Sequence, residues 1–214
     1  GITVRTGLSY SGIAQQNGEI RLSVDVGGRA ETLTAEQVLM TAGRTPNTAG
    51  LGLDEAGIRL APGGGIAVDD RMRTSKSGVY AAGDVTGRDQ FVYMAAYGAK
   101  LAVRNALNGD SLVYDNTTMP WVVFTDPQVA GVGLSESQAR EHGFDVKTSV
   151  APLDQVPRAL AARDMRGLVK LVADKKTDRL LGAQILAPEG ADSIQTMTLA
   201  ISTKTITRRL SMRC

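Results

Sequence analysis

The sequence has 214 residues and a formal net charge of +2 at pH 7, and 43% of its residues are hydrophobic. This composition is that of a globular protein with a buried core, and it excludes a disordered or fibrous chain. The near balance of acidic and basic residues gives no reason to expect binding to nucleic acid, and the lack of a long apolar run or a leader pattern favours a cytoplasmic protein outside the membrane.

The first part of the chain has the alternation that is typical of β structure. Residues 10–16 and 19–26 flank Asn17-Gly18, a dipeptide that tolerates the positive φ angles of a type I′ hairpin turn. A second hairpin turn is predicted at Gly27-Gly28, and a further strand at residues 37–40. Because apolar and polar residues alternate along residues 19–26, we expect this sheet to bury one face.

The middle of the chain combines glycines with short apolar runs. Gly63-Gly64-Gly65 has neither a G-x-G-x-x-G pattern nor a following helix, so we interpret it as the tip of a surface hairpin rather than a phosphate-binding loop. Short strands are predicted at residues 66–68 and 79–82. The second of these ends in Gly83-Asp84, at the point where an open α/β sheet binds its ligands. We therefore expect the carboxylate to accept hydrogen bonds from a sugar-like hydroxyl.

An alanine-rich segment follows this loop and is predicted to be a helix over about residues 91–107. Its amino end, Gln90-Phe91-Val92-Tyr93, would have free N–H groups and a partial positive charge. Such an end stabilises negative charge that develops on a bound group. Four small side chains are predicted to share one face of the helix and to pack tightly there: Ala95, Ala99, Ala102 and Ala106.

The last third of the chain is predicted to be an α+β layer. Ser135 and Gln138 match a capping box, which predicts a short helix that ends near Gly143. A final helix is predicted over about residues 189–202. Its buried face would carry Ile194, Met197 and Ile201. The predicted strands are residues 119–124, 129–132, 146–151, 168–173 and 180–187.

One string of the middle region resembles a known motif. Thr74 followed by Val79-Tyr80-Ala81-Ala82-Gly83-Asp84 is similar to the second FAD-binding motif of the pyridine-nucleotide flavin disulfide reductases. The resemblance implies that Asp84 binds the ribityl chain of the flavin and that the helix end at Val92 points at the flavin O2 edge. The FAD-binding residues that it implies are Gly83, Asp84, Gln90, Phe91, Val92 and Tyr93.

Further strings are similar to the same family and follow in its order. Gly43-Arg44-Thr45-Pro46-Asn47 resembles the segment that closes the NAD(P)-binding domain, which implies that Gly43 lies close to the nicotinamide nucleotide. Residues 120–130 resemble a strand pair in which the carbonyl of Val122 would face the nicotinamide. Gln155-Val156-Pro157-Arg158-Ala159-Leu160-Ala161 is most similar to members that reduce mercuric ion.

The resemblance implies a fold of α/β and α+β parts. Residues 1–47 would be the tail of an NAD(P)-binding domain, residues 48–112 the carboxyl-terminal segment of an FAD-binding domain, and residues 113–214 a truncated dimerisation domain. In this family such a domain joins two copies into a homodimer. The implied reaction passes hydride from NADPH through FAD to a cysteine pair, which reduces Hg(II) to elemental mercury.

The cysteine pair of that reaction is absent, because the single cysteine is the last residue, Cys214. Thiol exchange with a dithiol needs two thiols, so we expect no catalytic residue and no metal ligand in this sequence. The strand-like opening at Ile2-Thr3-Val4 and the unmatched tail, residues 204–214, favour a fragment that is inactive alone. His142 is interpreted as a surface residue at a helix end, where a cation suits the helix dipole.

Two alternatives stay open. The chain could be a fragment of a dihydrolipoamide dehydrogenase, a member of the same family, because the final segment that distinguishes the two kinds of enzyme is missing from the tail. It could also be a non-catalytic dimerising module. We expect Arg158 to lie at the dimer interface rather than to contact a substrate.

Overall fold

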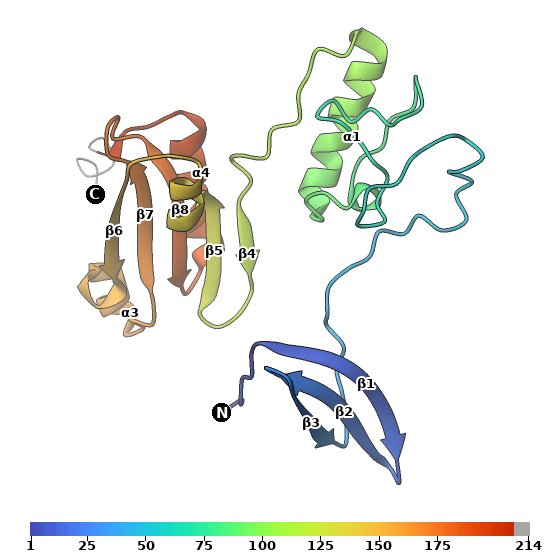
Figure 1. The fold of residues 1–214 in the computed structure, drawn as a ribbon. Coiled ribbons are helices and arrows are strands. Elements are labelled where there is room, and N and C mark those ends of the chain that lie inside the picture. Colours follow the sequence, from blue (N-terminus) through green and yellow to red (C-terminus); the bar gives the residue numbers. More distant parts are fainter. Residues whose placement is uncertain (208–214) are drawn as a thin grey trace. The chain divides into compact units, whose positions relative to one another are not determined.

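The computed structural model of the chain describes residues 1–207. The chain divides into two compact units, and the boundary between them falls at residue 102, within the helix α1 (Val92–Asn108) (Figure 1). Each unit has its own sheet. Cys214, for which the sequence suggests no metal-binding role, lies outside the described residues.

The first unit contains a three-stranded antiparallel sheet in the order β1-β2-β3. Both turns predicted from the sequence are confirmed: Asn17 and Gly18 have φ angles of 53° and 82°, and Gly27 and Gly28 have φ angles of 61° and 88°. One face is buried at Val24, which is only 1% exposed. The strands are β1 (Leu8–Gln16), β2 (Glu19–Val26) and β3 (Arg29–Ala35).

The strand predicted at residues 37–40 is wrong. This segment joins no sheet, and its side chains are largely exposed, 85% at Leu39 and 70% at Met40. The short apolar run has the composition of a buried strand, but a strand forms only where a neighbouring strand accepts and donates its backbone hydrogen bonds.

The strands predicted at residues 66–68 and 79–82 are also wrong, since each makes only one isolated bridge. Ile66 pairs with Leu60, and Tyr80 pairs with Arg73. These runs are too short and too closely bounded by turns to build a ladder. The turn at Gly63-Gly64-Gly65 is the predicted hairpin tip, closed by the N–H of Ala61, which donates to the carbonyl of Gly65 at 2.7 Å.

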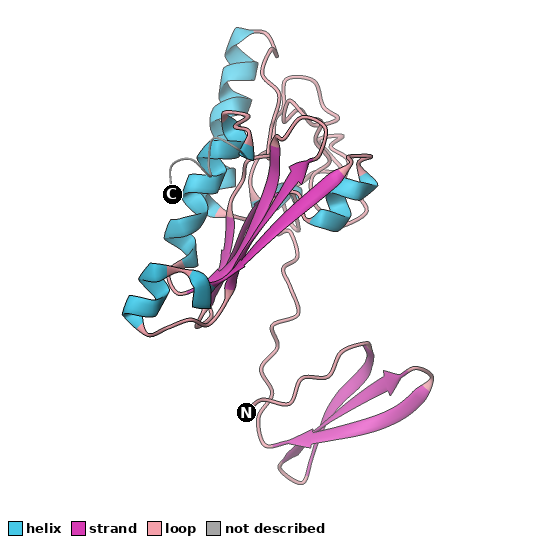
Figure 2. Cartoon of the chain, turned by 90° about the vertical axis from the view of Figure 1, so that its left-hand side faces the viewer, coloured by secondary structure: helices cyan, strands magenta, loops and turns pink. Residues whose placement is uncertain are grey.

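The second unit is built on a five-stranded antiparallel sheet in the order β4-β5-β8-β7-β6. Helices lie on both sides of this sheet (Figure 2). The strands are β4 (Trp121–Val123), β5 (Gln128–Gly133), β6 (Val146–Pro152), β7 (Leu168–Asp174) and β8 (Leu180–Ala187). The helices are α2 (Glu136–Glu141), α3 (Pro157–Ala162) and α4 (Gly190–Ser202), and the short 3-10 turn η2 (Leu153–Gln155) precedes α3.

The core of the second unit lies between α4 and the central strands. Ile194 is fully buried and Ile201 is 7% exposed, so the predicted inner face of this helix is confirmed. The predicted capping box is also confirmed, because Ser135 accepts a hydrogen bond from the N–H of Gln138 and the Gln138 side chain accepts one from the N–H of Ser135. The sequence analysis did not predict α3.

Candidate functional site

The loop at Gly83 is a tight turn held against the helix that follows. Gly83 has φ 83° and ψ −162°, a conformation open in practice only to glycine, and its carbonyl accepts hydrogen bonds from the N–H and Oγ1 of Thr86 at 2.9 and 2.8 Å. A Cβ built on Gly83 would lie 3.1 Å from Cβ of Ala95 in α1. The turn therefore brings the backbone of this loop into close contact with the helix.

Asp84 begins the 3-10 turn η1 (Asp84–Thr86), and its side chain is exposed. Thr86, by contrast, is buried and also accepts a hydrogen bond from the N–H of Arg88 through its hydroxyl at 3.2 Å. The sequence analysis did not single out Thr86, although it stands two residues after Asp84. Thr86 shapes the turn, and the Asp84 carboxylate stays accessible to a ligand.

The amino end of α1 is open to solvent. The first hydrogen bond within the helix runs from the N–H of Ala95 to the carbonyl of Phe91 at 3.0 Å, so the N–H groups before Ala95 have no partner inside the helix. The first turn contains no acidic residue, and Val92 and Tyr93 are 82% and 88% exposed. This end can therefore donate hydrogen bonds to a bound acceptor and stabilise negative charge on it.

The predicted alanine face of α1 is only partly buried. Ala102 is buried and Ala95 contacts the turn, whereas Ala99 and Ala106 are exposed. The buried face is shifted by about one residue from the predicted one, so it is turned about the helix axis. It includes side chains larger than alanine. Its members are Met94, Tyr97, Gly98, Leu101, Ala102 and Asn105. Met94, Tyr97 and Leu101 bury more apolar area on this face than alanine side chains would.

The segment from Gly43 to Thr48 is tied to the same loops. Gly43 is exposed and has φ 108°. The neighbouring Arg44 donates from Nη1 to the carbonyl oxygen of Gln90 at 2.7 Å. Thr48 donates from Oγ1 to the carbonyl of Gly64 at 3.0 Å. The structure thus places the two motifs of this unit side by side, and Arg44, which the sequence analysis gave no role, joins them.

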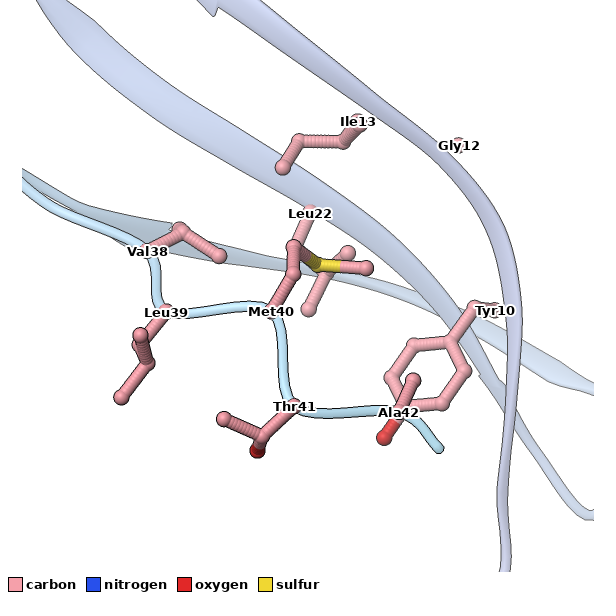
Figure 3. A pocket seen from close by; sticks show the side chains of 9 residues that line it. All are labelled: Tyr10, Gly12, Ile13, Leu22, Val38, Leu39, Met40, Thr41 and Ala42. Atoms are coloured by element: carbon pink, nitrogen blue, oxygen red, sulfur yellow. The ribbon is translucent and has the colours of Figure 1, made fainter. Parts of the chain in front are cut away.

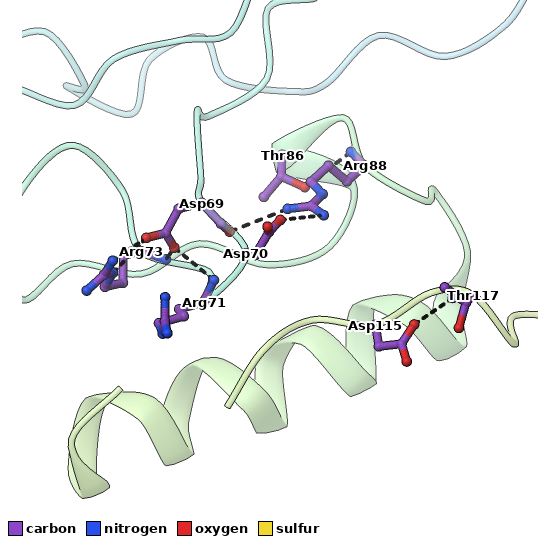
Figure 4. A network of polar contacts seen from close by, with 8 residues as sticks. All are labelled: Asp69, Asp70, Arg71, Arg73, Thr86, Arg88, Asp115 and Thr117. Atoms are coloured by element: carbon purple, nitrogen blue, oxygen red, sulfur yellow. Dashed lines mark hydrogen bonds and ion pairs between the residues drawn. The ribbon is translucent and has the colours of Figure 1, made fainter. Parts of the chain in front are cut away.

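A polar network joins residues 69–73 to Arg88 (Figure 4). Asp69 accepts hydrogen bonds from the N–H groups of Arg71 and Arg73 and from the Arg73 guanidinium, whose Nε lies 2.7 Å away. Arg88 reaches the carbonyl of Asp69 and the carboxylate of Asp70, each at 3.4 Å. Burial acts to raise the pKa of Asp69, but the hydrogen bonds from Arg73 and Arg71 outweigh it and hold the pKa below its ordinary value.

Val122 belongs to the second unit, where β4 is an edge strand of the sheet. Its side chain packs against the core. An edge strand leaves part of its backbone N–H and C=O groups unpaired within the sheet. β4 can therefore offer some of its backbone N–H and C=O groups to a ligand.

An apolar groove of about 390 Å³ lies beside the three-stranded sheet (Figure 3). Residues 38–42 run along it, opposite Tyr10, Ile13 and Leu22. Its lining is mainly apolar and contains no Asp, Glu, His, Lys or Arg side chain.

Other candidate residues have structural partners. His142 is the exposed C-terminal cap of α2, and its Nδ1 lies 2.7 Å from the carbonyl of Gln138, as expected for a helix end. Arg158, on α3, donates to Glu189 at 2.7 Å, and this hydrogen bond raises the pKa of the guanidinium. Within residues 1–207, no three His, Cys, Asp or Glu side chains gather into a metal-binding group. No helix in the described part of the chain is long and apolar enough to span a membrane.

Two family models match the chain. The model described as "Pyridine nucleotide-disulphide oxidoreductase" matches residues 1–102, and the model described as "Pyridine nucleotide-disulphide oxidoreductase, dimerisation domain" matches residues 119–214. The first model matches the whole of the first compact unit, and the second model matches the second unit from residue 119 onward.

Individual proteins are similar over most of this chain. A protein named mercuric reductase from Bacillus cereus is 44% identical over 94% of the chain, which spans 32% of that protein. A dihydrolipoyl dehydrogenase from Staphylococcus aureus is 37% identical over 94% of the chain and is itself covered over 43% of its length. The crystal structure of LpdA from Mycobacterium tuberculosis superposes with a TM-score of 0.83 at 29% identity, covering 96% of this chain and 44% of that one. The chain thus spans less than half the length of these relatives.

Proposed function

We propose a function from the premise that this chain belongs to the pyridine nucleotide-disulphide oxidoreductase family. The chain would be the carboxyl-terminal part of an NADPH-dependent flavoenzyme that reduces Hg(II) to elemental mercury. Proteins named mercuric reductase are among the relatives that are 41–44% identical to it, which supports this choice of substrate. The expected domain boundaries, at residues 47 and 112, and the cytoplasmic location are parts of the same proposal.

The observation that carries this proposal is the pairing of Asp84 with the open end of α1. The Gly83 turn lies against Ala95, so the exposed Asp84 and the first turn of α1 lie close together in the same compact unit. A carboxylate suits the hydroxyls of a ribityl chain, and helix N–H groups suit an oxygen that gains negative charge. The residues present therefore fit an FAD molecule.

The roles of the individual residues follow from this geometry. Asp84 would accept hydrogen bonds from the ribityl hydroxyls, and the N–H groups of Val92 and Tyr93 would face the flavin O2. Gly43 and the backbone of Val122 would contact the nicotinamide nucleotide. When bound, FAD would supply the transfer of hydride equivalents from NADPH toward a dithiol. The sequence contains one cysteine, so it cannot supply the dithiol. The residues named above would bind and orient the cofactors.

The family model of the dimerisation domain supports a homodimer as the assembly. The alternative activity of the whole enzyme is that of a dihydrolipoyl dehydrogenase, because a relative of that name is 37% identical over 94% of the chain. A non-catalytic dimerising module is the alternative for the chain by itself.

The test of this proposal is the visible absorbance spectrum of the purified chain, recorded before and after mixing with FAD and gel filtration. We expect flavin to co-elute with the chain. Mixing with NADPH and Hg(II) should give no NADPH oxidation above a control without protein, because no dithiol is present. Loss of all flavin on the column would contradict the proposed site, and oxidation driven by lipoamide in the whole enzyme would favour the alternative activity.

A further inference from the structure

We propose that Arg44 is a positioning residue that anchors the amino end of α1 and adds positive charge to it. This inference rests on the proposed function, because it assigns Arg44 to the same flavin site. It starts from one contact: Nη1 of Arg44 donates to the carbonyl oxygen of Gln90 at 2.7 Å, across 46 positions of the sequence.

The acceptor stands at the entry to the helix. Gln90 precedes Phe91, whose carbonyl accepts the first hydrogen bond within α1, from Ala95. The loop just before it has one strained residue, because the non-glycine residue Asp89 has a φ angle of 37°. A positive φ at a residue with a Cβ persists only where surrounding contacts hold it. The hydrogen bond from Arg44 is one such contact. It holds the peptide group between Gln90 and Phe91, which leads into the first turn of α1.

The charge of Arg44 also acts on the amino end of α1. A cation near a helix amino end opposes the helix dipole, so this placement weakens the helix unless an anionic group binds there. The first turn of α1 itself contains no acidic residue, and the nearest carboxylate before it in the sequence is that of Asp89. The guanidinium and the helix N–H groups therefore act in the same sense on a ligand that becomes more negative on reduction, as the flavin O2 edge does.

The segment that carries Arg44 is itself well held. A Cβ built on Gly87 would lie 3.4 Å from Cγ of Pro46, and Thr48 is bonded to Gly64. Arg44 thus extends from a fixed segment rather than from a free loop. Since Gly43 is the expected contact of the nicotinamide nucleotide, Arg44 links the two cofactor segments through one side chain.

The first experiment measures, without flavin, how well the hydrogen bond from Arg44 protects the entry to α1 from amide hydrogen exchange. Arg44→Met should speed amide hydrogen exchange several-fold in a peptide covering residues 88–97, because the entry to α1 opens more often. Arg44→Lys should rescue part of this protection, since lysine keeps the charge and one donor. Arg104→Met is the matched control: Arg104 is exposed on the same helix, and no ion pair or hydrogen bond of its side chain is seen among residues 1–207.

The second experiment measures flavin binding to the same variants. Arg44→Met should raise the Kd for FAD by roughly three- to tenfold, the range for losing one ordinary net hydrogen bond, because the bond to Gln90 positions the helix end that faces the flavin. It should also lower the preference for reduced over oxidised FAD by about two- to threefold, because one positive charge is removed. Arg44→Lys should keep most of that preference.

The outcomes separate the two proposals. A wild-type chain that retains no FAD overturns the proposed function and this inference together. A wild-type chain that retains FAD, while Arg44→Met matches Arg104→Met in exchange or in flavin preference, overturns this inference alone. Faster exchange with unchanged flavin binding would show an ordinary structural bond and would also overturn it.

Discussion

Asp84 and Asp69 lie in the same compact unit but present their carboxylates very differently. Both residues are exposed, but Asp69 accepts hydrogen bonds from Arg71 and Arg73, whereas no hydrogen bond or ion pair of the Asp84 carboxylate is seen among residues 1–207. A carboxylate that serves the fold is surrounded by donors, and one that serves a ligand must be left accessible. The contrast supports Asp84 as the ligand-binding member of the two.

We expect Asp84→Asn to weaken FAD binding by about tenfold or more, because a hydrogen bond to a charged group contributes about 1.5–3 kcal/mol. The thermal stability of the chain without FAD should stay within about 0.5 kcal/mol of the wild type, as for other exposed substitutions. Fluorescence titration with FAD measures the first effect. His142→Ala is the control, since His142 caps α2 in the other unit, and an equal loss in both variants would argue against the assigned site.

The pKa of Asp164 gives a prediction about pH. Hydrogen bonds from Arg166, whose Nη2 also lies 2.9 Å from Asp126, lower the pKa of Asp164 from 3.8 to about 2. A folded-state pKa below the unfolded value means that this carboxylate stabilises the native chain above about pH 4. That contribution is lost as the pH falls toward 2.

The measurement is an NMR titration of the Asp164 carboxyl carbon. We expect a midpoint near pH 2 in the wild type and one close to the ordinary value of 3.8 in Arg166→Gln. The difference in stability between the two proteins should shrink as the pH falls through this range. An unchanged midpoint in the variant would show that Arg166 is not the cause.

At the scale of elements, the turns and helix caps whose geometry depends on neighbouring residues could be predicted from the sequence. The hairpin at Asn17-Gly18 and the capping box at Ser135 were correct because each needs only four adjacent residues to specify its geometry. Residues 37–40 and 79–82 have strand composition, but pairing depends on distant neighbours that a local pattern does not contain. The short helix α3 was missed because its six residues are too few to show a helical period.

In the candidate site, too, the local features could be predicted from the sequence and the long-range contacts could not. The turn at Gly83 and the start of α1 could be located from sequence, within one residue at the helix start. The bond between Arg44 and Gln90 joins residues 46 positions apart, so no local pattern could indicate it. The only indication in the sequence was that residues 43–47 and residues 74–84 both resemble motifs of one family.

The capping box of α2 yields a prediction about stability. Ser135→Ala removes the acceptor for the N–H of Gln138, and we expect it to destabilise the protein by about 1 kcal/mol. Urea denaturation followed by the fluorescence of Trp121, in the same unit, measures the change. Ser149→Ala, at an exposed position of β6, should have little effect, and a similar loss in both variants would contradict the capping role.

At the scale of the whole molecule, the flavin should act as a stabilising ligand. A molecule that binds only the native state stabilises it by about 2.7 kcal/mol at a hundredfold excess over Kd. We therefore expect the Tm of the chain to rise steadily with FAD concentration, measured by differential scanning calorimetry. Asp84→Asn should need more FAD for the same rise, and a Tm independent of FAD would contradict binding to the native chain.

The strand order of the second sheet has a consequence for how the protein is made. β8 lies between β5 and β7, although it is the last strand along the chain. During translation, the hairpin of β4 and β5 and the hairpin of β6 and β7 emerge from the ribosome before the strand that joins them. Until Leu180–Ala187 has been synthesised, the inner edges of both hairpins are open to other nascent chains.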